Sequence, residues 1–152
     1  MTYDSFLMEV NQQGLYIYED RMPYSIKGLY GDNVICINNL IPTTIEKKCA
    51  GAEEVGHHNT TAGNILDQTD TQNRKQELRA RAWGYEYLIP LSLLVEAGRA
   101  GVEGRHDVAE WLEVTEDFLQ CTIEHYQRKY GLYKVVGPDL IYFEPLTLTP
   151  LC

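Results

Sequence analysis

The chain has 152 residues, of which 44% are hydrophobic and 23% are charged. This length suits one compact domain, and these fractions are near the averages for soluble globular domains, which argues against a disordered chain and a membrane protein. Thirteen Lys and Arg face 22 Asp and Glu, and the resulting net charge of −9 disfavours direct binding to nucleic acid. The N-terminus lacks the features of a secretory signal, and the four cysteines are widely separated. We therefore expect a single domain over 1–152 in the cytoplasm, with no membrane contact.

The first forty residues predict one helix and one hairpin. Residues 3–18 place apolar side chains in a mixed pattern that fits a helix broken near Gly14. Two runs rich in β-branched and aromatic residues follow, at 25–30 and 34–38. The turn residues Gly31, Asp32 and Asn33 separate these runs, so the pair predicts a β-hairpin.

A helix is then expected from about 43 to 58. Thr43 followed by Glu46 fits a capping box, in which each side chain satisfies a free backbone donor at the helix start. The positions expected to be buried are apolar or small and follow helical spacing: Ile45, Cys49, Ala52 and Gly56. The polar segment 59–73 predicts a long connection of the kind that often borders a functional site.

The second half of the chain is predicted to be mainly helical. Helices are expected at 74–88, 93–97, 107–112 and 116–130. Pro90 ends the first of these, Thr115 caps the last, and Gly131 stops it. The last two helices form a C-terminal helical pair at 107–131. Residues 132–152 are expected to be an extended tail, in which 140–143 could add one edge strand, and the fold class is α+β.

The segment Glu53-Glu54-Val55-Gly56-His57 carries the clearest chemical signal. In the HExxH motif, two metal ligands lie four residues apart on one helix face, and the Glu after the first ligand acts as general base. Here the first ligand position is Glu53, whose carboxylate oxygen can also bind zinc. Two alternatives remain at this point: the shifted pair Glu54 and His58, which has the same spacing, and a solvated acidic turn beside surface histidines.

This motif and its surroundings resemble the ImmA/IrrE metallopeptidases, particularly the phage and mobile-element branch. The resemblance covers most of the chain, including segments 26–33, 46–58, 60–68 and 77–90. It implies a zincin-like minimal metallopeptidase fold, with Glu77 as the third metal ligand and Glu54 as the general base. Glu53 replaces the usual first histidine of the family. Without the resemblance, Glu77 would be interpreted as an ion-pair partner of Arg74 or Arg81.

The resemblance also implies a zinc-type endopeptidase that cleaves a specific cytoplasmic protein, a DNA-binding transcriptional repressor of a mobile element or a stress response. One alternative is a non-catalytic regulatory or protein-binding relative with a metal site. Its helical pair at 107–131 resembles a helix-turn-helix, yet residues 107–126 contain six acidic residues and no Lys or Arg. A third hypothesis is a silent relative that senses or stores metal.

The replacement of histidine by Glu53 has a consequence for the metal. Two carboxylates cancel the charge of a divalent ion, whereas a His₂Glu site leaves one positive charge. Zn²⁺ is the expected cofactor, and an oxygen-rich site also accommodates Mn²⁺ or Fe²⁺. From these charges alone, Glu53→His is expected to bind Zn²⁺ at least as tightly as the native chain.

Overall fold

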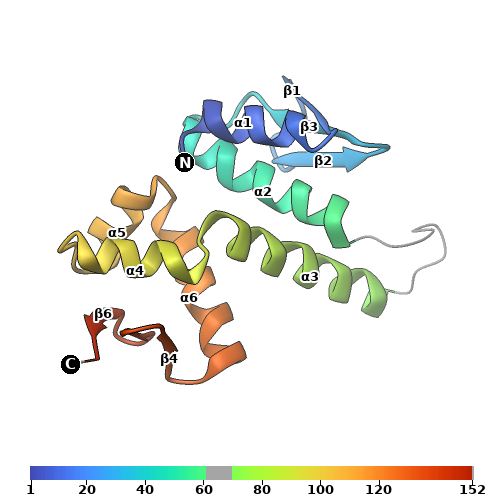
Figure 1. Cartoon of the computed structure of the whole chain (residues 1–152). Helices are drawn as coiled ribbons and strands as arrows, with labels where there is room; N and C mark the ends of the chain where they lie inside the picture. Colours follow the sequence, from blue (N-terminus) through green and yellow to red (C-terminus); the bar gives the residue numbers. More distant parts are fainter. Residues whose placement is uncertain (61–69, 152) are drawn as a thin grey trace. The chain divides into compact units, whose positions relative to one another are not determined.

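The computed structural model describes residues 1–60 and 70–151, with the side chains of 70–72 excepted. The chain divides into two compact units, Met1–Gly84 and Tyr85–Cys152. Helices make up most of the described structure and small sheets accompany them, so the expected α+β, zincin-like class is confirmed (Figure 1). Among the described helices, none is long and apolar enough to cross a membrane. The organisation as a single domain over 1–152 stays a prediction.

The first unit combines a three-stranded sheet with helices. Its elements are α1 (Tyr3–Gln12), β1 (Tyr16–Asp20), β2 (Gly28–Gly31), β3 (Val34–Asn38), α2 (Thr44–Thr60) and the part of α3 (Asp70–Leu88) that reaches Gly84. The strand order is β1-β3-β2, with β1 parallel and β2 antiparallel to β3. Figure 1 shows α2 between this sheet and α3. Both long helices extend further into the predicted connection 59–73 than expected, and residues 61–69 of that connection lie outside the described residues.

The prediction of a broken helix over 3–18 was wrong in its second half. The helix ends at Gln12, Gly14 takes a φ of +86°, and Tyr16–Asp20 form a strand. Glycine adopts this left-handed conformation without steric cost, so the chain can turn sharply there. The following residues gain backbone hydrogen bonds by pairing with β3, a contact distant in sequence that local periodicity does not reveal.

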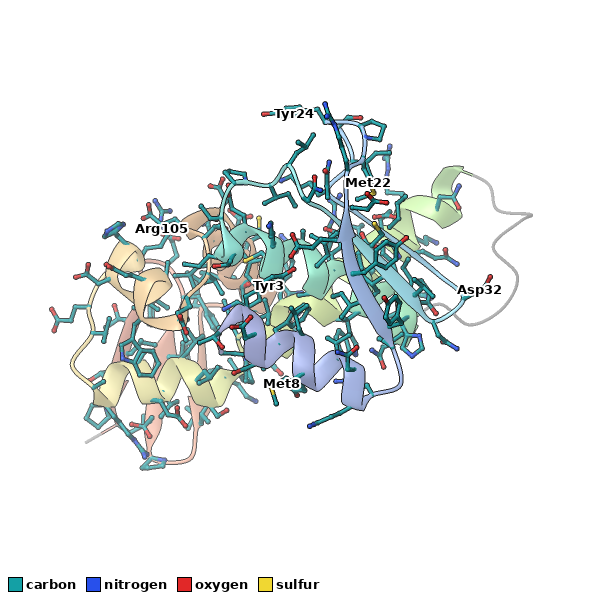
Figure 2. All side chains as sticks on the ribbon, turned by 90° about the horizontal axis from the view of Figure 1, so that it is seen from above. Tyr3, Met8, Met22, Tyr24, Asp32 and Arg105 are labelled. Carbon is teal, nitrogen blue, oxygen red and sulfur yellow. The ribbon has the colours of Figure 1, made fainter. Side chains whose placement is uncertain are left out.

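The predicted hairpin is confirmed, although its first strand is shorter than the run 25–30. Asp32 and Asn33 have φ values of 49° and 64°, as a tight two-residue hairpin turn requires, and Asp32 lies at the tip (Figure 2). The buried amide of Asn38 holds the preceding loop: its nitrogen donates to the carbonyls of Pro23 at 3.1 Å and Ile26 at 2.7 Å. Residues 25–27 therefore belong to this loop and not to the strand.

The buried face of α2 differs from the predicted one. Ala52 and Gly56 are buried as expected, but Ile45 is exposed and Cys49 is only partly buried. The buried positions are Lys48, Gly51, Ala52, Val55 and Gly56. Lys48 belongs to this face because its ammonium donates to the Met1 carbonyl at the start of the chain. The spacing of apolar residues cannot predict that a lysine is buried through such a hydrogen bond.

The described part of the second unit contains the end of α3, three further helices and a second sheet. The elements after α3 are α4 (Leu91–Arg99), α5 (Arg105–Leu112), α6 (Glu116–Tyr130), β4 (Tyr133–Val136), β5 (Asp139–Tyr142) and β6 (Thr147–Pro150). The predicted cap of α6 is confirmed, because Thr115 accepts a hydrogen bond from the Phe118 amide at 3.0 Å. The extended tail predicted at 132–152 instead contains a three-stranded antiparallel sheet, in which Ile141 is fully buried.

Candidate metal centre

Helix α2 presents two adjacent rows of polar side chains. The Thr43 half of the predicted capping box starts this helix, because the Glu46 amide donates to the Thr43 hydroxyl at 3.1 Å. The Glu46 carboxylate accepts from that hydroxyl at 2.8 Å, which is a contact between side chains. Residues four apart lie on one face of a helix, and neighbouring residues point about 100° apart. One row therefore holds Glu53 and His57, and the next holds Glu54 and His58.

Small residues bring α2 and α3 into close contact. A side chain at Gly56 would meet the carbonyl oxygen of Ala80 at 2.1 Å, and one at Gly84 would meet that of Ala52 at 3.0 Å. Ala52 and Ala80 are themselves fully buried. Glycine and alanine at these four positions let the two backbones approach, which brings the Glu77 side chain of α3 to the first row of α2.

The structure groups Glu53, His57 and Glu77. Each offers one ligand atom, and these atoms all lie within 4.8 Å of one another. Ligands bonded to one tetrahedral zinc ion at about 2.0–2.2 Å lie roughly 3.4 Å apart, and His57 Nε2 lies 3.3 Å from Glu77 Oε1. The His57 side chain is 19% exposed and that of Glu77 is 47% exposed, so the group is open on one side. The residue types and spacings fit a divalent metal with room for a substrate.

Arg81 pairs with Glu53. Its Nε donates to Glu53 Oε1 at 3.2 Å, and the side chain lies one turn beyond Glu77 on α3. One of the two arginine partners considered for Glu77 therefore contacts a different member of the group. Glu77 itself faces His57.

The second row of α2 faces strand β2. A side chain at Gly28 would meet Glu54 Cγ at 3.0 Å, so glycine at this strand position leaves space for the Glu54 carboxylate. One turn further along, Tyr30 and His58 share a hydrogen bond of 2.8 Å between Oη and Nδ1. Their rings meet edge to face, with centroids 5.4 Å apart. His58 therefore contacts the strand, and not the group formed by Glu53, His57 and Glu77.

An open pocket of about 230 Å³ lies between β2 and α3. It is lined by Leu29 and Tyr30 from the strand, Glu54 and His57 from α2, and Asn73, Gln76 and Glu77 from α3. Glu54 contributes to this lining although most of its side chain is buried. Burial and then the negative charges of Glu53 and Glu77 raise the pKa of Glu54 to about 7. A carboxylate with such a pKa can both accept and return a proton near neutral pH.

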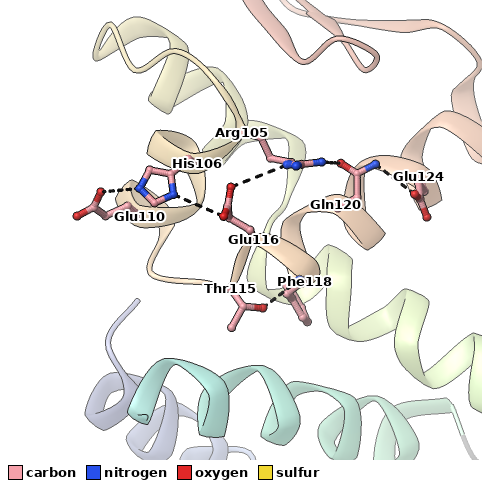
Figure 3. A network of polar contacts seen from close by, with 8 residues as sticks. All are labelled: Arg105, His106, Glu110, Thr115, Glu116, Phe118, Gln120 and Glu124. Atoms are coloured by element: carbon pink, nitrogen blue, oxygen red, sulfur yellow. Dashed lines mark hydrogen bonds and ion pairs between the residues drawn. The ribbon is translucent and has the colours of Figure 1, made fainter. Parts of the chain in front are cut away.

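A second group of potential ligands is located on α5. His106, Asp107 and Glu110 also lie within 4.8 Å of one another, but all three are exposed. His106 lies 3.9 Å from Glu110 and 3.5 Å from Glu116, and the whole arrangement is a chain of polar contacts between α5 and α6 (Figure 3). Ion pairs in solvent account for these positions, so we interpret the group as a solvated surface network.

The fold is that of a zincin-like metallopeptidase, with a small sheet, a helix that carries two potential ligands four residues apart, and a second helix that carries a third. The family model described as the IrrE N-terminal-like domain, a peptidase family, matches residues 10–124. The chain therefore belongs to this family, the ImmA/IrrE metal-dependent peptidases. Comparison with individual curated proteins gave no match.

Gly28, Tyr30 and Arg81 were not predicted from the sequence as participants in the site. Gly28 and Tyr30 were part of the predicted hairpin, and a glycine inside a strand is a known signal of close approach by another group. That signal could have directed attention to Gly28. Glu53, which Arg81 contacts, lies on another helix, and no spacing in the sequence identifies this pair.

Proposed function

We propose that this protein is a metal-dependent endopeptidase in which Glu53, His57 and Glu77 hold one divalent ion and Glu54 is the general base. The observation that carries the proposal is the grouping of three ligand atoms within 4.8 Å beside a pocket that Glu54 also lines. The positions of Glu54 against Gly28 and of His58 against Tyr30 support the pair Glu53 and His57 over the shifted pair. Zn²⁺ is the proposed ion, and Mn²⁺ or Fe²⁺ also suit two carboxylates and one imidazole.

A divalent ion held by these residues supplies Lewis acidity, which polarises the peptide carbonyl and makes water easier to deprotonate. The chain's own contribution is proton transfer and orientation. The Glu54 carboxylate accepts a proton from water as the water oxygen bonds to the carbonyl carbon. It then returns a proton to the leaving nitrogen as the C–N bond breaks, so the carboxylate is regenerated. Gly28 leaves room for the Glu54 side chain in this position.

We further propose that the substrate is a cytoplasmic DNA-binding repressor that controls a mobile element or a stress response. The family membership supports a protein substrate. The pocket of about 230 Å³ accommodates few side chains, and it gives little sequence selectivity by itself. Docking of a whole folded partner would then provide the specificity.

Metal analysis and cleavage assays test the proposal together. Protein purified without chelator should contain close to one divalent ion per chain, and Glu53→Ala, His57→Ala and Glu77→Ala should each lose it. Glu54→Gln should keep the metal and abolish cleavage of a co-encoded repressor, because the amide preserves shape but accepts no proton. Glu96→Gln, at an exposed carboxylate of α4, is the matched control.

The outcomes separate the hypotheses. If Glu77→Ala keeps full metal occupancy, Glu77 is not the third ligand. A Glu54→Gln variant as active as the wild type would reject Glu54 as the base. A wild-type protein that binds metal and cleaves no repressor would favour the non-catalytic regulatory or metal-sensing alternative.

A further inference from the structure

Arg81 occupies an unusual position for a cation, at the edge of a group of potential metal ligands. Its Nε donates to Glu53 Oε1 at 3.2 Å, with the arginine side chain 50% exposed and that of Glu53 33% exposed. Arg81 follows Glu77 by four residues, so the helix that supplies the third ligand also supplies this cation. The close contact between Gly56 and Ala80, the residue before Arg81, fixes this part of α3 against α2.

The contact leaves Glu53 able to bind a metal. A carboxylate has two oxygens and about four lone-pair sites, so Oε1 can accept from Arg81 while the other oxygen faces an ion. Ligating carboxylates are commonly held by a hydrogen bond of this kind, which orients them toward the metal. The guanidinium also stays protonated at any pH in which a protein folds.

The charge of Arg81 matters because Glu53 stands at the first ligand position of the motif. With Glu53 and Glu77 both ionised, a divalent ion in the site would be neutralised. The positive charge of Arg81 returns the group of three side chains and the ion to a net charge of +1. That is the value for two histidines and one glutamate, the ligand set in which position 53 would be a histidine.

We propose that Arg81 is a positioning residue for Glu53: it orients the carboxylate toward the ion and offsets the charge that this carboxylate adds. The inference rests on the proposed metal site. It also revises the expectation from ligand charges alone, since Glu53→His would remove the carboxylate that Arg81 contacts and would place the guanidinium near an ion whose charge is less well neutralised. Glu53→His should therefore weaken Zn²⁺ binding as long as Arg81 is present.

Zn²⁺ affinity, measured by competition with a chromophoric chelator, tests the inference without any substrate. Arg81→Met in the wild-type background should weaken Zn²⁺ binding about tenfold, the lower end of the effect of removing a group that orients a ligand. Arg81→Lys keeps the charge and should keep most of the affinity. Arg79→Met, at an exposed arginine of the same helix, should leave the affinity unchanged. Thermal unfolding of the metal-free variants verifies that each one folds.

A double-mutant cycle with Glu53→His then measures the coupling. In the Glu53→His background, Arg81→Met should cost no affinity, because there is no carboxylate left to orient and a repulsive charge is removed. An equal loss in both backgrounds overturns the inference, as does an Arg81→Met variant that binds Zn²⁺ like Arg79→Met. If Glu53→His binds no Zn²⁺ at all, the inference is tested by the single variants: it holds if Arg81→Met binds Zn²⁺ more weakly than Arg81→Lys and Arg79→Met, and it fails if the three affinities are equal. Wild-type protein that binds no metal would instead overturn the proposed function itself.

Discussion

At the scale of single residues, Glu54 links protonation to stability. Burial and the charges of Glu53 and Glu77 raise its pKa to about 7, whereas a glutamate in an unfolded chain titrates near 4.3. Between pH of about 4.3 and about 7, the Glu54 carboxyl of the folded, metal-free protein therefore holds a proton that the unfolded chain releases. This contribution to the free energy of unfolding is fully present below pH of about 4.3 and is lost as the pH rises to about 7.

We expect Glu54→Gln to stabilise the metal-free protein at alkaline pH, because the amide never has to be buried as a charge. With chelator present, the free energy of unfolding in urea should exceed that of the wild type by on the order of 3 kcal/mol at pH 8. The difference should disappear near pH 4, where the native carboxyl is protonated in both states. Glu96→Gln serves as the exposed control, and a difference that does not vary with pH would contradict the assignment.

Some residues of the site could be predicted from the sequence because they lie on one helix, and others could not because they lie on different elements. Glu53 and His57 could be proposed from spacing because one helix fixes their relation. The prediction of Glu77 as a ligand required the family resemblance, because Glu77 follows His57 by twenty residues and that separation does not fix their distance in space. Arg81 and Tyr30 became recognisable only through contacts between elements, with Glu53 in one case and His58 in the other.

At the scale of elements, the contact between α2 and α3 controls the site. Gly56 packs directly against the backbone of Ala80, and Glu77 lies three residues before Ala80. A methyl group at Gly56 would stand 2.1 Å from a carbonyl oxygen, which is backbone and cannot rotate away. The helices would have to separate, and the distance between His57 and Glu77 would grow with them.

Gly56→Ala should therefore damage both stability and metal binding. We expect a loss of about 2 kcal/mol or more in the free energy of unfolding, within the range for overpacking a close contact, and a clear loss of metal from protein purified without chelator. Gly31→Ala is the matched control, because its added methyl group meets no other atom within 4 Å. Unchanged metal content in Gly56→Ala would show that the site tolerates separation of the helices.

The elements also show which parts of the fold a sequence can reveal. Helices α2, α3 and α6 have strong local signals, including the caps at Thr43 and Thr115, and all three were predicted. Strand β1 was missed because its partner β3 lies about eighteen residues away and pairs in parallel. The C-terminal sheet was missed because strands of four residues carry little periodicity, and their pairing supplies most of the signal.

At the scale of the whole molecule, negative charge is the dominant property. The chain carries a formal net charge of −9, and the pair α5 and α6 contributes without offsetting cations between Asp107 and Tyr126. Arg105, just before this stretch, donates to Gln120 at 2.7 Å and lies 4.0 Å from Glu116 (Figure 3). Its guanidinium is thus engaged with α6. A helical pair that binds DNA needs the opposite arrangement, with cations directed at phosphates.

We therefore expect the purified protein not to bind duplex DNA through α5 and α6. Fluorescence anisotropy at 50 mM salt should show binding weaker than about 10⁻⁴ M, the weak limit for non-specific DNA binding. A variant with Glu110→Lys and Asp117→Lys changes the net charge by four, from −9 to −5, and should bind more tightly with a clear dependence on salt. Binding by that variant would show that the assay can detect DNA binding and that the native negative charges prevent it. Tight, salt-sensitive binding of duplex DNA by the wild type would contradict this expectation.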